Sequence, residues 1–293
     1  MSHLSTLVAK ELALPVDPRV TAMAEAVAAQ YPKAARAVLF YGSCLREQNL
    51  DGLMLDFYLI VSSYRETYGR GWYAAANKLV PPNVFPFEHE GLAAKYAVLS
   101  EADFQRENGP EAGTVSVWAR FAQPSRLVWA KDEAAREKAA AAVERAAPTL
   151  FGFALPMVPE GEQGDPLAIW RRGFELTYDS ELRAERQGKS ISIVDTDPER
   201  YRQFGEAALP LANPLTPEKA RKRWARFRRK GKAMSLVRLA KATTTFAGGV
   251  DYIAWKINRH AGTQIVVKPW QRRWPILGAL TLLPRLLRRG AIR

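Results

Sequence analysis

Two neighbouring apolar runs of this sequence carry residues suited to binding a phosphate and a metal ion. Gly42 and Ser43 end the first run, "AVLFYGS", and Asp56 lies inside the second, "LMLDFYLIV". Glycine lets a backbone approach a ligand closely, and the exposed amides of such a turn can bind phosphate oxygens. A carboxylate inside an apolar strand is costly unless it is paired, hydrogen-bonded or bound to a metal ion. Taken separately, the two features also fit an ordinary turn and a strand-edge aspartate that faces solvent.

The segments around these residues must form the elements that position them. "AVLFYG" and "LMLDFYLIV" are rich in β-branched and aromatic residues, which predicts two buried, paired strands. "AKYAVLS" and "SRLVWA" predict further strands, whereas the prolines of "PPNVFPFEHEG" predict a loop. Helices are expected at "RVTAMAEAVAAQY", "YRETYGRGWYAAANKL" and "EADFQREN", the last with Ser100 as its N-cap.

The pattern changes near residue 130, beyond which nearly every segment predicts a helix. These segments include "KDEAAREKAAAAVERAAPTLFGFAL", "DPLAIWRRGFELTYDSELRAE", "DPERYRQFGEAAL" and "TPEKARKRWARFRRKGKAMSLVRLAKATTTF". The predicted fold class is therefore α+β. A domain with a mixed sheet and flanking helices is expected over residues 1–130, a helical domain that closes over the site over 131–262, and a basic tail over 263–293.

A strand, a Gly-Ser turn and a second strand that carries aspartate form the core of the nucleotidyltransferase fold. In that fold the carboxylate holds Mg²⁺ on a nucleoside triphosphate, and the turn backbone cradles the phosphates. The usual motif has two carboxylates on one strand face, two residues apart. Here Tyr58 occupies the second position, so the match to the general motif is incomplete.

Several segments, taken in order, resemble one branch of this superfamily, the mitochondrial-type phosphatidate cytidylyltransferases, also called translocator assembly and maintenance proteins. "FYGSCL" resembles that family's Tyr-Gly-Ser-Gly turn, and "LMLDFYLIV" resembles its second strand, which holds a single aspartate. Four further segments resemble the family's later motifs: "AAKYAVLSEADF", "VWARFAQPSRLVW", "GFELTYDSELR" and "SLVRLAKATTTFAGGV". Each segment is short, and only their order makes the resemblance specific.

The resemblance implies an enzyme that uses CTP and Mg²⁺ to convert phosphatidic acid into CDP-diacylglycerol, with release of pyrophosphate. It places Gly42 and Ser43 against the triphosphate and Asp56 on the metal ion. Lys95 would neutralise phosphate charge, and Arg120 would bind phosphate with its planar guanidinium. The attacking oxygen is already anionic, so positioning and charge neutralisation should dominate catalysis. The plainer interpretations are a surface lysine for Lys95 and a structural ion pair for Arg120.

The resemblance also implies contributions from the helical half. Glu181 stands where the family has aspartate, so it would complete the metal site or act as a base, with Arg183 nearby for a phosphate. Asp179 could take the role of Glu181, or both could lie on a solvated helix face.

The sequence departs from the family's pattern around the expected acceptor side. Cys44 and Ala119 replace glycines, Gln123 replaces a lysine, and Ser62 stands where many members have aspartate. These departures concern the acceptor more than the nucleotide chemistry. Another lipid phosphate, such as a ceramide phosphate, is therefore the alternative acceptor.

Composition limits the remaining function classes. The net charge of +13 indicates an anionic partner, and the 47% apolar content is sufficient for a core. A single cysteine excludes an internal disulfide and a cysteine-based zinc site, and three scattered histidines make a histidine metal cluster improbable. Without a signal-peptide pattern or a long apolar segment, we expect a cytoplasmic protein, peripheral on the inner face of the membrane.

The C-terminal third combines basic and aromatic residues. "KPWQRRWPILGALTLLPRLLRRGAIR" has the composition of a helix that lies in the interface of an anionic membrane. Its apolar part could instead pack on the protein's own core or on a second subunit. Basic residues interleaved with aromatics also suit nucleic acid, so a nucleic-acid-binding protein on a degenerate nucleotidyltransferase scaffold is the less favoured alternative.

Overall fold

The computed structural model of the chain describes residues 2–46, 50–181, 193–245 and 268–269. Its strands are β1 (Ala35–Tyr41), β2 (Met54–Val61), β3 (Asn83–His89), β4 (Leu92–Ser100) and β5 (Ser125–Ala130). The α-helices are α1 (His3–Leu12), α2 (Pro18–Ala29), α3 (Tyr64–Tyr68), α4 (Trp72–Leu79), α5 (Glu101–Glu107), α6 (Trp118–Phe121), α7 (Glu133–Glu144), α8 (Ala146–Ala154), α9 (Pro166–Ser180), α11 (Pro198–Ala208) and α12 (Pro217–Thr245). Short 3₁₀ turns are η1 (Ser43–Arg46), η2 (Leu155–Met157), η3 (Glu160–Glu162) and η4 (Leu209–Leu211).

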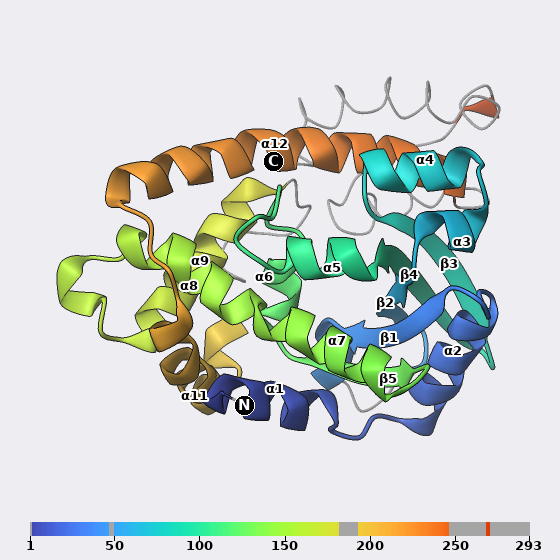
Figure 1. The fold of residues 1–293 in the computed structure, drawn as a ribbon, viewed down its shortest axis with the longest axis horizontal. Coiled ribbons are helices and arrows are strands. Elements are labelled where there is room, and N and C mark those ends of the chain that lie inside the picture. The colour runs from blue at the N-terminus through green and yellow to red at the C-terminus, as the bar shows by residue number, and fades with distance from the viewer. Residues whose placement is uncertain (1, 47–49, 182–192, 246–267, 270–293) are drawn as a thin grey trace.

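The five strands form one mixed sheet in the order β3-β4-β2-β1-β5. β1 pairs antiparallel with β2 and β5, β2 pairs parallel with β4, and β3 pairs antiparallel with β4. The α+β class predicted from the sequence is confirmed, with this sheet in the first part of the chain and helices after it (Figure 1).

The period-2 alternation of the strands sends side chains to two separate cores. One face, with Leu39, Ile60 and Leu99, packs in the same buried cluster as residues of α1, α5, α6 and α7. The opposite face, with Phe40 and Leu59, packs against α2. The first cluster continues past residue 130 into α8, α9, α11 and α12, so the sheet and the helices share a core. The boundaries at 130 and 262 stay predictions.

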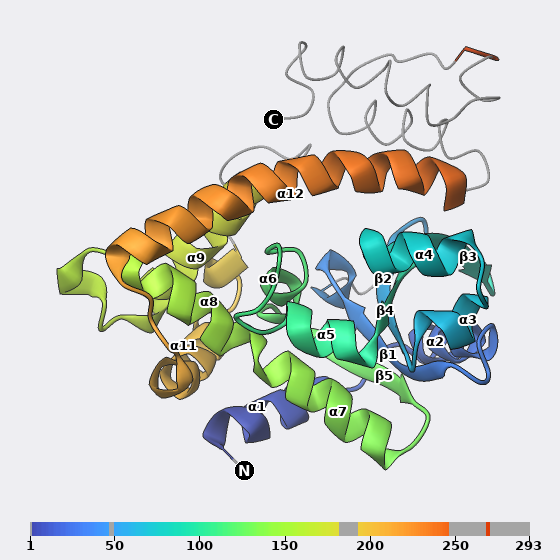
Figure 2. The same ribbon diagram turned by 45° about the horizontal axis from the view of Figure 1, so that its top comes forward.

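The long helix α12 crosses the molecule from the helical part to the sheet. Its first half packs through Trp224 and Phe227, which are fully buried. Its second half reaches the sheet beside α4 and β3, as both ribbon views show (Figures 1 and 2). Within the described residues, no helix is both long enough and apolar enough to cross a bilayer.

The structure differs from the sequence prediction in three places. The expected loop "PPNVFPFEHEG" contains β3, which tolerates Pro86 because it is an edge strand with one unpaired side. The segment predicted as one helix over residues 64–79 divides at Gly69 and Gly71 into α3 and α4. The long alanine-rich helix divides at Arg145 into α7 and α8. The tail over 263–293 lies outside the described residues apart from 268–269.

Candidate active site

The strand register places Tyr41, Asp56 and Lys95 in one row across the sheet. Tyr41 of β1 is opposite Asp56 of β2, and Asp56 is the parallel-strand neighbour of Lys95 on β4. Alternation puts all three on the face that carries Leu39 and Ile60. This row therefore forms the polar end of an otherwise apolar sheet face.

The Asp56 carboxylate is partly buried and paired. Its Oδ1 lies 2.5 Å from Lys95 Nζ, and the two side chains are 23% and 25% exposed. Its Oδ2 faces the Gly-Ser turn, because a Cβ added to Gly42 would lie 3.4 Å from that oxygen. Gly42 has φ +94°, a conformation that favours glycine. The strand aspartate thus lies against the turn, as the nucleotidyltransferase interpretation requires.

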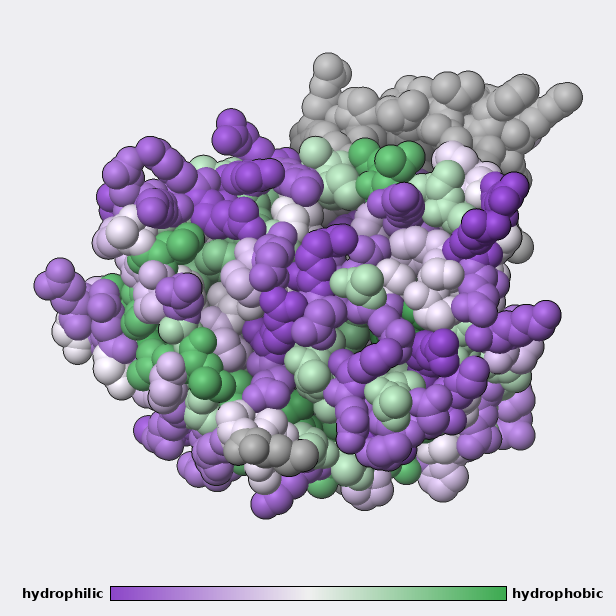
Figure 3. Space-filling view, viewed as in Figure 1, coloured by the Kyte–Doolittle hydropathy of each residue, from purple (hydrophilic) through white to green (hydrophobic). Residues whose placement is uncertain are grey.

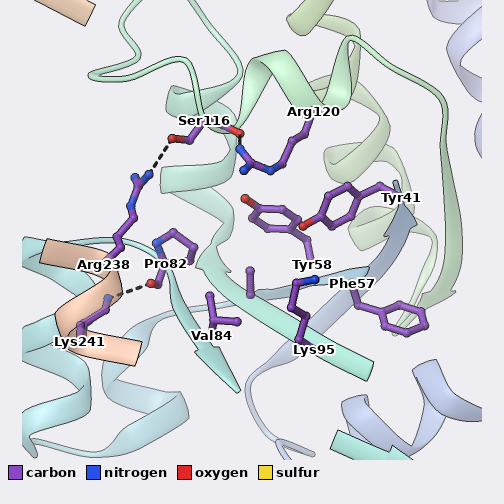
Figure 4. Close-up of a pocket in the computed structure, with 11 residues that line it drawn as sticks. Tyr41, Phe57, Tyr58, Pro82, Val84, Lys95, Ser116, Arg120, Arg238 and Lys241 are labelled. Carbon is purple, nitrogen blue, oxygen red and sulfur yellow. Dashed lines mark hydrogen bonds between the residues drawn. The ribbon is translucent and has the colours of Figure 1, made fainter. Parts of the chain in front are cut away.

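A pocket of about 170 Å³ opens next to Lys95 (Figure 4). Side chains from the sheet, from the loop before β3, from α6 and the segment leading into it, and from α12 surround it. The lining residues are Tyr41, Phe57, Tyr58, Pro82, Val84, Lys95, Ala97, Ser116, Arg120, Arg238 and Lys241. Four of them are cationic side chains and none is acidic, so the pocket suits an anion with several negative charges.

Arg120 and Glu181 meet at the helical wall of this pocket. Arg120 Nη1 lies 3.7 Å from Glu181 Oε1, and the Glu181 side chain is only 7% exposed. Ser116 donates its hydroxyl to Glu181, and the Arg120 guanidinium donates to the Ser116 carbonyl. Burial alone would lower the pKa of Arg120, but the neighbouring Glu181 carboxylate and further groups around the guanidinium, Asp56 among them, together raise this pKa above its usual value. Arg120 is therefore a permanent, oriented cation.

Arg238 and Lys241 bring two further cations from α12. Arg238 donates from Nη1 to Ser116 Oγ at 2.6 Å and from Nε to the Pro81 carbonyl at 2.8 Å. Lys241 donates to the carbonyls of Val80 and Pro82. Burial, followed by the charge of Arg238, lowers the pKa of Lys241 to about 7. The charge on this side of the pocket consequently depends on pH.

The structure brings some of the predicted site residues to the pocket and places others away from it. Lys95 and Arg120 line the pocket, and Asp56 contacts Lys95 from the neighbouring strand. Ser43 is exposed at the start of η1, one residue after Gly42. Glu181 is buried against Arg120, whereas Asp179 is exposed. Arg183 lies outside the described residues.

Asp56 offers a ligand that fits Mg²⁺. Its Oδ2 faces the Gly42 corner, where phosphate oxygens would supply other ligands, and Mg²⁺ is commonly held by one or two carboxylates plus substrate phosphates. Glu181 contacts Ser116 and Arg120, and these contacts make it a positioning group for that arginine. Among the residues that the structure describes, no three histidine, cysteine or acidic side chains cluster as a metal site.

Comparison with known proteins yields little. No protein-family model matches the chain, and no curated protein matches it. Among solved structures it is similar to a nucleotidyltransferase-like protein from Exiguobacterium sibiricum, at 10% identity and a TM-score of 0.29, with 92% of each chain covered. At that TM-score the interpretation rests on the chain's own sheet and pocket.

Sequence reasoning missed Ser116, Arg238 and Lys241. Arg238 and Lys241 lie in "SLVRLAKATTTF", at the end of a basic segment that is predicted to be helical and resembles a family motif, but the sequence did not assign either residue to the site. Their i, i+3 spacing places both on one face of α12, which is a detectable signal. That this face meets the loop after α4 follows only from the tertiary structure.

Proposed function

We propose that the protein is a nucleotidyltransferase that joins the cytidylyl group of CTP to a lipid phosphate. The preferred acceptor is phosphatidic acid, which would give CDP-diacylglycerol and pyrophosphate. The sequence resemblance supports the choice of CTP and phosphatidic acid, and the site geometry supports the class of reaction. One observation carries the proposal: Asp56 faces the Gly42 corner while its partner Lys95 opens into a pocket of four cations.

The residues present can perform such a transfer without a strong base. An oxygen of the acceptor phosphate bonds to the α-phosphorus of CTP, the bond from that phosphorus to the bridging oxygen breaks, and pyrophosphate leaves. Lys95 and Arg120 lie where they can neutralise the charge that accumulates on the leaving group. Glu181 and Ser116 hold Arg120 in place, so its orientation is set before the nucleotide arrives.

Mg²⁺, when bound with the nucleotide, would offset triphosphate charge, and Asp56 is the residue that would hold it. Lys95 fixes the orientation of this carboxylate through the 2.5 Å ion pair. The neighbouring tyrosines contribute uncharged aromatic side chains to the wall, because burial raises the pKa of both Tyr41 and Tyr58.

The purified chain should be assayed with each nucleoside triphosphate, Mg²⁺ and a panel of phospholipids, with pyrophosphate release as the measurement. We expect release only with CTP and phosphatidic acid together. Release with ceramide phosphate would replace the acceptor and keep the reaction class. No release under any combination, from a protein that is folded by circular dichroism, would refute the enzymatic proposal.

A nucleic-acid-binding protein on a degenerate scaffold is the second candidate, favoured by one observation. The outer side of α12 exposes a row of cations: Lys219, Arg221, Lys222, Arg226, Arg228, Arg229, Lys230 and Lys232. Such a row can neutralise a phosphate backbone. A gel shift with RNA that persists unchanged in Asp56→Ala would favour this candidate, because that function needs no strand carboxylate.

A further inference from the structure

The short helix α4 exposes apolar side chains on its outward face. Trp72 is 61% exposed and Leu79 is 77% exposed, and Ala75 between them is also exposed. The spacing i, i+3, i+7 puts the three on one stripe, about 10 Å long at the helical rise. The inward face is already used, because Ala76 and Asn77 are buried. Helix α4 thus carries an apolar stripe that the described part of the chain leaves exposed.

This stripe adjoins an apolar part of α12. Exposed Arg226, Lys230, Ala233 and Val237 follow one another at helical spacing, so the outward stripe of α12 changes from basic to apolar toward its C-terminal end. That end lies beside α4 in both ribbon views (Figures 1 and 2). Hydrophobic side chains gather over the same region in the space-filling view (Figure 3).

The stripe also adjoins the pocket. The residues that directly follow Leu79 are Val80, Pro81 and Pro82, and their carbonyls accept hydrogen bonds from Lys241 and Arg238. Pro82, Arg238 and Lys241 line the pocket. The exposed end of α4 is therefore continuous in the chain with the pocket wall.

Charge indicates what the stripe meets. Exposed Arg70 and Lys78 are close to Trp72 and Leu79 in the chain, and exposed Arg65 lies on α3, which contacts α4. The whole chain carries a net charge of +13. Tryptophan and leucine bordered by lysine and arginine is the composition of a surface that enters the interface of an anionic bilayer. A nucleic acid would satisfy the cations but would leave Leu79 and Val237 in water.

We propose that Trp72, Ala75 and Leu79 of α4, with Val237 of α12, form a surface that docks on an anionic phospholipid bilayer and presents the pocket to lipid headgroups. This proposal rests on the proposed function, since it explains how a lipid phosphate reaches the cations. It places a membrane contact on α4 and α12, in addition to the one predicted for residues 263–293.

An environment-sensitive thiol probe tests the surface directly in the full chain. The chain's single cysteine, Cys44, is buried, so Trp72→Cys directs the label to α4. Leu14→Cys is the matched control, because Leu14 is 49% exposed and follows α1, which lies away from α4 and α12 in Figure 1. With vesicles of phosphatidylcholine and phosphatidylglycerol, we expect a blue shift and quenching by brominated lipid at position 72 and neither at position 14.

Every other pattern overturns the proposal. A probe at position 72 that stays in water on vesicle-bound protein would show that another surface docks. A probe that is shielded before vesicles are added would show that the chain's own tail covers the stripe, or, if shielding rises with protein concentration, that a second copy does. A probe that RNA shields and vesicles do not would assign the face to nucleic acid.

Measurements of turnover distinguish the role of this surface from that of the pocket. Trp72→Ser with Leu79→Ser should lower activity on vesicle-embedded phosphatidic acid at least about tenfold and leave activity on a soluble short-chain phosphatidic acid unchanged. Lys95→Met should abolish both activities and leave the probe response at position 72 intact. If the wild-type chain shows the probe response but releases no pyrophosphate, the proposed function fails and the docking surface stands.

Discussion

The two sides of the pocket are held by different means. On the sheet side, Tyr41, Asp56 and Lys95 are successive members of one row, fixed by backbone pairing between β1, β2 and β4. On the helical side, Arg120 and Arg238 come from segments far apart in the chain and converge on Ser116 through side-chain hydrogen bonds. The sheet side is therefore rigid without the help of its polar side chains, whereas the helical side depends on them.

This difference predicts which substitutions change turnover alone and which change both turnover and the free energy of unfolding. Changing a polar side chain in the strand row should alter turnover and leave the free energy of unfolding nearly unchanged. Changing one in the helical network should alter both, because the half-buried arginines satisfy hydrogen-bonding groups of the buried Ser116 and Glu181.

The largest effect is expected for Asp56→Asn. It removes the charge that faces the Gly42 corner and leaves the side-chain shape and the strand pairing, so pyrophosphate release should fall on the order of a thousandfold. Thermal unfolding followed by circular dichroism should remain close to wild type. The matched control is Asp179→Asn, because Asp179 is an exposed aspartate on α9. A loss of turnover in that control would indicate that Asp179, rather than Glu181, is the carboxylate of the helical part that the reaction needs.

Arg120→Gln should combine a loss of turnover with a loss of stability. It removes the cation that lies 3.7 Å from the buried Glu181 carboxylate, so we expect unfolding to be easier by about 3 kcal/mol and turnover to fall about a hundredfold. Chemical denaturation and pyrophosphate release measure the two effects.

The chain contains a second buried pair that serves as the control. Arg200 on α11 contacts Glu11 on α1 at 2.8 Å, with both side chains about a tenth exposed. Arg200→Gln should cost comparable stability with little loss of turnover. Adding Glu181→Gln to Arg120→Gln should recover stability but not turnover. Equal losses of turnover in Arg120→Gln and Arg200→Gln would mean that Arg120 acts only through the fold.

Arg120 and Arg200 also show where sequence reasoning ends. Both are arginines in helical segments that pair with a distant glutamate, and only the family resemblance, not composition or spacing, distinguishes Arg120 from Arg200. Asp56 is different, because strand alternation and its nearness to Gly42 are local properties that the sequence displays. On the sheet side, Gly42, Ser43 and Asp56 could therefore be predicted from the residues themselves, whereas Lys95 came only from the family resemblance and Tyr41 was not predicted. The helical side required the packing of α9 and α12 against the sheet, which involves contacts over more than a hundred residues.

The predictions of secondary structure likewise succeeded where the signal was local and failed where it depended on the whole sheet. β1, β2, β4 and β5 are apolar and were predicted from their composition, whereas β3 was expected to be a loop. The prolines of β3 suggested a break, but an edge strand has only one partner, and β4 supplies it. The sequence cannot show that a segment lies at an edge, because strand order is a property of the whole sheet.

Gly42→Ala should have an intermediate effect that tests the contact between the turn and Asp56. Alanine at φ +94° costs about 1 kcal/mol of stability, and its Cβ would lie 3.4 Å from Asp56 Oδ2, so turnover should fall about tenfold. Gly52→Ala is the matched control, since Gly52 has φ +72° with no atom within 4 Å of an added Cβ. Both variants should lose similar stability, and only Gly42→Ala should lose turnover. A similar loss of turnover in both would show that the Gly42 corner holds no reacting group.

The smallest effect concerns the charge of Lys241. Burial lowers the pKa of this side chain to about 7, so the pocket gives up a positive charge as pH rises from 6 to 8, and affinity for an anion should fall in that direction. Lys241→Arg keeps its charge at both values. Calorimetric titration with pyrophosphate should therefore show the Kd of wild type rising relative to that of Lys241→Arg by up to about tenfold between pH 6 and 8. The ligand's own protonation cancels in this ratio, because both proteins meet the same pyrophosphate. A constant ratio would place Lys241 outside the anion's reach and leave Lys95, Arg120 and Arg238 as the cations that bind it.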